Sequence, residues 1–124
     1  MNETSFKILS YYRGGIFRWQ RWRSLSPDWT HDHCLGCSVR FAERPEQWSD
    51  RICTDGWVTL APVSKASSSE FIDGLQARGY NYVPAPAPGG YHAEWLCAEC
   101  FEHVRQELGF IVDPDHPQWK QAGL

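Results

Sequence analysis

Cys34-Leu-Gly-Cys37 pairs two cysteines across two residues, and Cys97-Ala-Glu-Cys100 repeats that spacing toward the other end of the chain. Two thiolates this close in sequence can reach one metal ion, and zinc prefers four such ligands at the corners of a tetrahedron. The fifth cysteine, Cys53, has no partner at this spacing and is interpreted as a plain thiol of the core or surface. The two pairs therefore predict one structural Zn²⁺ held by Cys34, Cys37, Cys97 and Cys100.

The second pair opens the clearest helix of the sequence. From residue 97 to residue 108, cysteine and apolar side chains recur at the three- and four-residue spacing of one buried helix face, and Gly109 is placed to end the helix. Unpaired N–H groups of a first helical turn can hydrogen-bond thiolates. Gly36 suits a tight turn over residues 34–37, called the knuckle below, because a residue there often needs a positive φ. Knuckle plus helix N-terminus resembles the arrangement of treble-clef zinc sites.

The rest of the pattern predicts a single zinc-stabilised α+β domain over residues 1–124. We expect a small antiparallel sheet with two or three helices, clamped by the zinc site. Strands are expected at residues 6–12, 57–61 and 80–83, and further helices at 38–43 and 67–79. The Pro/Ala/Gly stretch 84–90 predicts an exposed loop, and 111–124 an irregular tail.

Length and composition bound the class of protein. The 124 residues suffice for one domain, and 15% aromatic residues exclude a chain that is disordered throughout. No stretch approaches the ~18 consecutive apolar residues of a membrane span. The first residues show no pattern of a secretory signal. Together with an odd number of cysteines, this favours zinc over disulfides and predicts a cytoplasmic protein.

Two histidines complicate the ligand set. His31 and His33 flank the first cysteine pair, so either could replace a thiolate, although solvated positions near the site are favoured. A redox dithiol is disfavoured because neither pair follows a βαβ pattern. His92-Ala-Glu94 before the second pair has some likeness to the zinc deaminase signature, but the spacing is too short and the proline is missing. We therefore predict no enzyme.

A run of arginine and aromatic residues precedes the first cysteine pair. Arginines could contact phosphates and tryptophans stack on bases, which makes a nucleic-acid-binding regulator the alternative function. The competing interpretation places the aromatics in the core. The two are distinguished by whether the arginines form one exposed basic face beside an open tryptophan. The residues concerned are Arg13, Arg18, Trp19, Arg21, Trp22 and Arg23.

Charge favours a protein partner over nucleic acid. Residues 1–44 carry seven basic and four acidic side chains, whereas residues 45–124 carry five and eleven. Four thiolates around one zinc add further negative charge. We therefore expect a non-enzymatic protein-binding module, such as an immunity or inhibitor protein that neutralises a basic partner. Nucleic acid and membrane partners are not expected.

The cysteine pairs belong to two longer segments, Asp32-His-Cys34-Leu-Gly-Cys37 with Phe41 after it, and Trp95-Leu-Cys97-Ala-Glu-Cys100-Phe101. These segments are similar to those of a group of small uncharacterised bacterial proteins, which pair Asp-His-Cys-x-x-Cys with Trp-x-Cys-x-x-Cys-Phe. The resemblance covers about a third of the chain. Where that group often has an aromatic residue after the second cysteine, this chain has Ser38. The resemblance implies the metal site and no particular activity.

Overall fold

The computed structural model describes residues 1–24, 28–62, 91–121 and 124. Within these residues the chain is α+β, as predicted. The helices are α1 (Glu3–Ser10), α3 (Ala98–Leu108) and α4 (Gln118–Gln121), with a single 3₁₀ turn η1 (Pro45–Gln47). The strands are β1 (Ile16–Arg21), β2 (Asp32–His33), β3 (Arg40–Phe41), β4 (Ile52–Cys53), β5 (Asp55–Pro62), β6 (Tyr91–Leu96) and β7 (Ile111–Val112).

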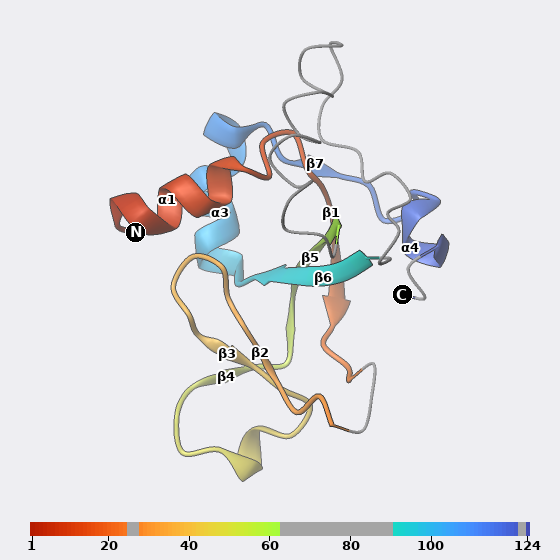
Figure 1. Ribbon diagram of the computed structural model, residues 1–124. Coiled ribbons are helices and arrows are strands. Elements are labelled where there is room, and N and C mark those ends of the chain that lie inside the picture. Colours follow the sequence, from red (N-terminus) through yellow and green to blue (C-terminus); the bar gives the residue numbers. More distant parts are fainter. Residues whose placement is uncertain (25–27, 63–90, 122–123) are drawn as a thin grey trace.

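Among the described residues, the strands form two small sheets (Figure 1). In the larger sheet, ordered β6-β5-β1-β7, the first three strands are antiparallel neighbours and β7 joins β1 in parallel. In the smaller sheet, β3 pairs with β2 antiparallel and with β4 in parallel. A parallel pair needs a connection that leaves the sheet and returns. The chain between β3 and β4 contains η1, and the chain between β1 and β7 contains α3. Both sheets are therefore mixed, and the prediction of an antiparallel sheet is wrong in this respect.

The two sheets meet beside the first cysteine pair. Cys34 forms an isolated parallel bridge with Trp95 of β6, and the Leu35 N–H donates to the Trp95 carbonyl at 2.9 Å. β6 then leads directly into α3, whose N-terminal cap is Cys97. Because the bridge fixes the turn after β2 against the end of β6, it brings the two cysteine pairs together.

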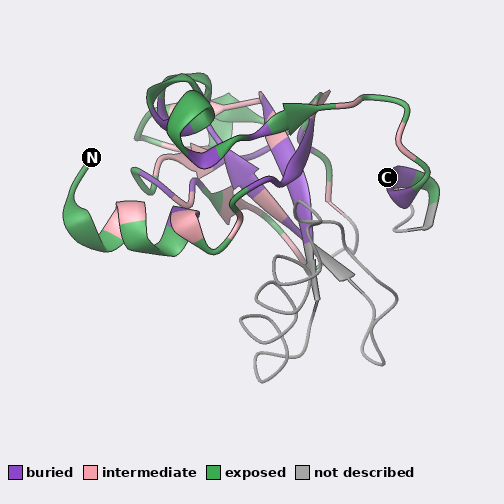
Figure 2. Ribbon diagram, turned by 90° about the horizontal axis from the view of Figure 1, so that it is seen from above, coloured by how far each residue is buried: buried purple, intermediate pink, exposed green. Residues whose placement is uncertain are grey.

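The helix α3 packs its apolar face on the larger sheet. Phe101 stacks on Trp57 of β5 with ring centroids 4.2 Å apart, and it meets Phe17 of β1 edge to face at 5.3 Å. The ring centroids of Phe110 and Phe17 are 4.4 Å apart. Figure 2 shows the buried residues gathered in the central strands and the exposed ones on the outer sides of the helices. The predicted helix is confirmed, since α3 ends at Gly109 with φ at 64°.

The strand predicted at residues 6–12 is wrong, because α1 occupies this segment. The Asn2 side chain accepts a hydrogen bond from the Ser5 N–H at 2.8 Å, which satisfies a donor of the first turn. Leu9 is fully buried, whereas Ile8 and Tyr11 remain exposed. The cap at Asn2 and the burial of one helix face at Leu9 stabilise the helix, although the local sequence favours a strand.

Other predicted elements differ as well. Residues 38–43 contain β3 in place of the expected helix, because this segment closes the turn between β2 and β3. The tail 111–124, predicted irregular, contains β7 and α4. Trp119 there is only 1% exposed, and its indole N–H donates to the Asp113 carbonyl at 2.8 Å. The predicted elements at 67–79, 80–83 and 84–90 lie outside the described residues, and β6 was not predicted.

Candidate metal centre

The first two cysteines lie in a tight turn between β2 and β3. The Ser38 N–H donates to the Cys34 carbonyl at 3.0 Å, and the Cys34 N–H donates to the Val39 carbonyl at 2.8 Å. The left-handed residue of this turn is Ser38, with φ at 66°, so the expected positive φ at Gly36 is wrong. Gly36 is needed for space, because a Cβ atom there would lie 2.7 Å from the Cys100 Sγ.

The other two cysteines lie at the start of α3. Cys97 caps the helix with an extended backbone (φ −70°, ψ 162°), and Cys100 belongs to the first turn. The Phe101 N–H donates to the Cys97 carbonyl at 3.0 Å, which fixes the cap against that turn. The start of α3 and its cap therefore place Cys97 and Cys100 on the same side of the helix, facing the knuckle.

The four sulfur atoms form a compact cluster. The Sγ atoms of Cys34, Cys37, Cys97 and Cys100 all lie within 4.8 Å of one another, and those of Cys37 and Cys97 are 3.7 Å apart. A tetrahedral ion with metal–sulfur distances of about 2.3 Å would separate its sulfur ligands by about 3.8 Å. A disulfide would require about 2.05 Å. The cysteines are free thiols at the spacing of a four-sulfur metal site.

Backbone N–H groups support this cluster. The Cys34 Sγ accepts from the Gly36 N–H at 3.4 Å and from the Cys97 N–H at 3.3 Å. Such bonds stabilise a thiolate, because they place positive N–H dipoles on the charged sulfur. One of these bonds comes from the knuckle itself and the other from the cap of α3. The surroundings of Cys34 therefore suit an anionic sulfur ligand.

Burial shapes the proton affinity of the thiols. Burial, together with the nearby Cys34, raises the pKa of Cys97 to about 11 and also raises the pKa of Cys100. Burial acts in the same direction on Cys37, but hydrogen bonds from the Val39 backbone and the neighbouring thiols outweigh it and lower the pKa of Cys37. A metal ion must therefore displace protons when it binds here, as thiolate-bound ions do.

The two histidines do not join the sulfur cluster. The His33 Nδ1 lies 3.0 Å from the Ser38 carbonyl oxygen, within hydrogen-bond distance at the end of the knuckle. The His31 ring packs edge to face with those of His33 and Trp48, each with centroids 5.0 Å apart. Among the described residues, the cysteine cluster is the group placed to hold a metal ion. Cys53 on β4 is half-buried and lies outside it.

Two of the six residues of the arginine and tryptophan run are packed into the structure. Trp22 is 2% exposed, and its indole N–H donates to the Asp32 carboxylate at 2.8 Å. The Arg18 guanidinium is half-buried and lies 4.8 Å from the centre of the Trp119 ring. Burial, with the nearby Arg23, lowers the pKa of Arg18. These two side chains are packed into the fold.

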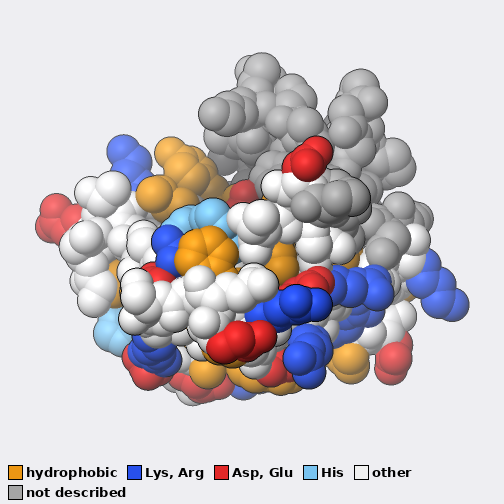
Figure 3. All heavy atoms as spheres, turned by 90° about the horizontal axis from the view of Figure 1, so that it is seen from below, with side chains coloured by type: hydrophobic (Ala, Val, Ile, Leu, Met, Phe, Trp, Pro, Cys, Tyr) orange, Lys and Arg blue, Asp and Glu red, His pale blue; other side chains and the backbone are white. Residues whose placement is uncertain are grey.

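The remaining members of the run are exposed. Arg13 donates to the Glu107 carbonyl at 3.1 Å, at the C-terminal end of α3. Trp19 is 47% exposed, and Arg21 and Arg23 are exposed at the end of β1. Figure 3 shows Lys and Arg side chains interspersed with Asp and Glu on one face of the molecule. The nucleic-acid alternative over residues 13–23 stays a prediction.

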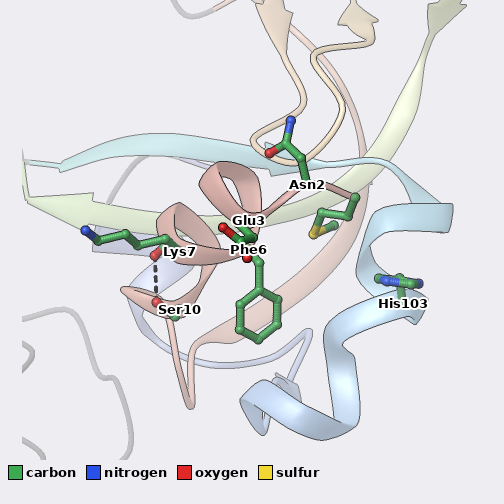
Figure 4. A pocket seen from close by; sticks show the side chains of 7 residues that line it. Asn2, Glu3, Phe6, Lys7, Ser10 and His103 are labelled. Carbon is green, nitrogen blue, oxygen red and sulfur yellow. Dashed lines mark hydrogen bonds between the residues drawn. The ribbon is translucent and has the colours of Figure 1, made fainter.

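A hollow of about 420 Å³ opens beside the sulfur cluster. It lies between the knuckle, the start of α1 and the first turns of α3. Its lining includes Asn2, Cys37, Ser38, Glu99, Cys100 and His103. A neighbouring hollow between α1 and α3 shares Asn2 and His103, and Figure 4 shows Phe6 and His103 on its two sides. No motif in the sequence marked this hollow, because α1 was not recognised as a helix.

The fold and the site define a small α+β protein with a four-cysteine cluster that could hold a metal ion. Comparison with family models, with curated proteins and with solved structures returns no match. In the described part of the chain, no helix combines the length and the apolar character needed to cross a membrane. The interpretation of the site therefore rests on its own geometry.

Proposed function

We propose that the four cysteines bind one Zn²⁺ ion whose role is structural. The observation that carries the proposal is the set of four Sγ atoms within 4.8 Å, three of them on buried residues. Four protein ligands fill a tetrahedral site, so no position is left for a substrate or a catalytic water. The ion would join the knuckle to α3, two elements that residues 38–96 separate in sequence. We therefore also propose that the chain is not an enzyme.

Elemental analysis of protein purified without chelator tests the zinc assignment. We expect one zinc per chain in the wild type and in Cys53→Ser, because Cys53 lies outside the cluster. Cys34→Ser should lose most of the metal. Iron also accepts four thiolates, so iron in place of zinc would contradict the assignment, as would well under half an equivalent of zinc.

We further propose that the chain is a protein-binding module for a basic partner, such as an immunity or inhibitor protein. The hollow beside Cys37 supports this, because it has the exposed Glu99 carboxylate on its rim. Four thiolates carry twice the charge that one Zn²⁺ neutralises, so the site adds negative charge there. Arg51 lies 3.5 Å from Glu99, but both are exposed and the pair is weak. A lysine or arginine of a partner fits this hollow.

Charge reversal at the hollow tests the partner proposal. The partner is isolated from the source cells with the wild-type chain as bait, then purified for kinetics. Glu99→Lys on the rim of the hollow, combined with Glu102→Lys one turn further along α3, should slow its association several-fold and flatten the salt dependence, since rim charges act mainly on association. Glu46→Lys on η1 is the matched control and should bind as the wild type does.

Two results would contradict the partner proposal. The first is a double reversal that leaves association and its salt dependence unchanged. The second is a single-stranded oligonucleotide that binds at physiological salt and is lost in Arg21→Ala with Arg23→Ala. With a net charge of −3, we expect no measurable oligonucleotide binding under these conditions.

A further inference from the structure

We propose that Cys37 is an oxidation site, whose thiolate attacks a hydroperoxide to give a sulfenic acid, and that Cys97 then forms a disulfide with Cys37, which releases the metal. This inference rests on the proposed zinc centre and adds a chemical reactivity to it. The structure distinguishes Cys37 from the other ligands by its exposure, by the hollow beside it and by its distance to Cys97. Each of these can be followed separately.

Exposure selects the thiolate that reacts with the hydroperoxide. Cys34, Cys97 and Cys100 are 2%, 2% and 8% exposed, whereas Cys37 is exposed. The hollow of about 420 Å³ reaches both Cys37 and Cys100, but the latter residue is buried beneath the knuckle. A hydroperoxide is small enough to enter such a hollow. Cys37 is therefore the sulfur that an oxidant meets first.

The surroundings of the sulfurs point the same way. A metal-bound thiolate keeps a lone pair and remains a nucleophile, but each N–H donor on the sulfur draws electron density from it. Cys34 accepts two such bonds, from Gly36 and from Cys97, in addition to being buried. Both its geometry and its hydrogen bonds make Cys34 a stable ligand. Cys37 accepts one N–H bond, from the Val39 backbone, and is exposed, so it is the more reactive member of the knuckle pair.

The chemistry balances with hydrogen peroxide as the oxidant. The Cys37 thiolate attacks one peroxide oxygen, the O–O bond breaks, and a sulfenic acid and hydroxide result. The Cys97 thiolate then attacks the sulfenic sulfur, forming the S–S bond and expelling a second hydroxide. Two protons convert the hydroxides to water. Two thiolates are oxidised and one peroxide is reduced, so the centre loses two of its four ligands.

Cys97 is placed to complete the disulfide. Its Sγ lies 3.7 Å from that of Cys37, so the bond needs a closing movement of less than about 2 Å. The new bond would also keep the knuckle attached to the cap of α3 after the metal leaves. A thiol reductant with added Zn²⁺ should therefore restore the original centre.

Substoichiometric labelling tests the first step on the full chain as purified. N-ethylmaleimide at less than one equivalent, followed by peptide mapping, should place at least about tenfold more label on Cys37 than on any other cysteine. Cys53 provides an internal comparison, because it is half-buried and lies outside the cluster. Preferential label on Cys34, Cys97 or Cys100, or equal label on Cys53, overturns the assignment of Cys37.

Peroxide titration of zinc-loaded protein tests the second step. Zinc content is measured first, and release is followed with a chromophoric chelator. We expect one zinc released for each Cys37–Cys97 disulfide found by mass spectrometry, in wild type and in Cys53→Ser alike. Protein without zinc at the start contradicts the proposed zinc centre. Zinc retained after oxidation, or a disulfide that joins other cysteines, overturns this inference alone.

Discussion

Gly36 shows how a single residue allows the close packing of the cysteine cluster. Its neighbour across the site is Cys100, whose Sγ would lie 2.7 Å from an added Cβ atom. Ser38 takes the left-handed conformation of the turn. Gly36 is therefore required for its lack of a side chain and not for its backbone conformation. The spacing of the cysteines predicted which four cysteines come together. The reason for Gly36 could not be predicted, because it depends on a contact with a residue from the other end of the chain.

Gly36→Ala should therefore weaken metal binding without removing a ligand. Overpacking costs about 1–3 kcal/mol, which predicts zinc affinity lower by about tenfold or more. Gly109→Ala is the matched control, because Gly109 has φ at 64° and no heavy atom within 4 Å of the added Cβ. It should lower the melting temperature and leave zinc affinity unchanged. Competition with a chromophoric chelator measures the zinc affinity of both variants, and equal affinities would refute the steric role of Gly36.

At the scale of elements, the tail is the clearest departure from the sequence patterns. Its prolines predicted an irregular segment, yet β7 adds to the larger sheet and α4 packs on it. The Gln118 side chain, 2% exposed, donates to the Ile16 carbonyl at 3.4 Å. These contacts join residues about a hundred positions apart. The helix α3 was predictable because its periodicity is local, whereas α1, β7 and α4 depend on caps and distant partners.

The two tryptophans Trp119 and Trp19 offer a matched test of this tail. Trp119 is 1% exposed and Trp19 is 47% exposed. Trp119→Ala should cost about 3–5 kcal/mol of unfolding free energy, because it leaves a large cavity. Trp19→Ala should cost much less, since the Trp19 ring keeps half of its contact with water. Chemical denaturation measures both, and equal losses would show that the tail does not belong to the core.

At the scale of the whole molecule, the cysteine cluster ties together segments that are distant in sequence. The knuckle closes the smaller sheet and α3 covers the larger one, so a bound ion would link both sheets. The α+β class and the clustering of the four cysteines followed from the cysteine spacing and the helix pattern. The mixed strand directions did not, because strand pairing depends on which connections cross over. A core that includes Trp22, Trp95 and Trp119 shares the task of holding the fold.

Removal of the metal should destabilise the whole molecule. Structural zinc contributes about 10–16 kcal/mol of binding free energy in zinc-finger peptides. We expect Cys100→Ser, or a strong chelator, to lower the melting temperature by more than about 10 °C. Cys53→Ser should melt as the wild type does. A Cys100→Ser variant that melts within about two degrees of wild type would show that the site is peripheral to stability.

The central claim is that one Zn²⁺ is bound by Cys34, Cys37, Cys97 and Cys100, with no histidine ligand. X-ray absorption at the zinc edge tests it most directly, because the metal–ligand distance distinguishes sulfur from nitrogen. The structure predicts four sulfur ligands at about 2.3 Å. A fit that requires nitrogen or oxygen at about 2.0–2.1 Å, as binding by His31 or His33 would give, contradicts the claim.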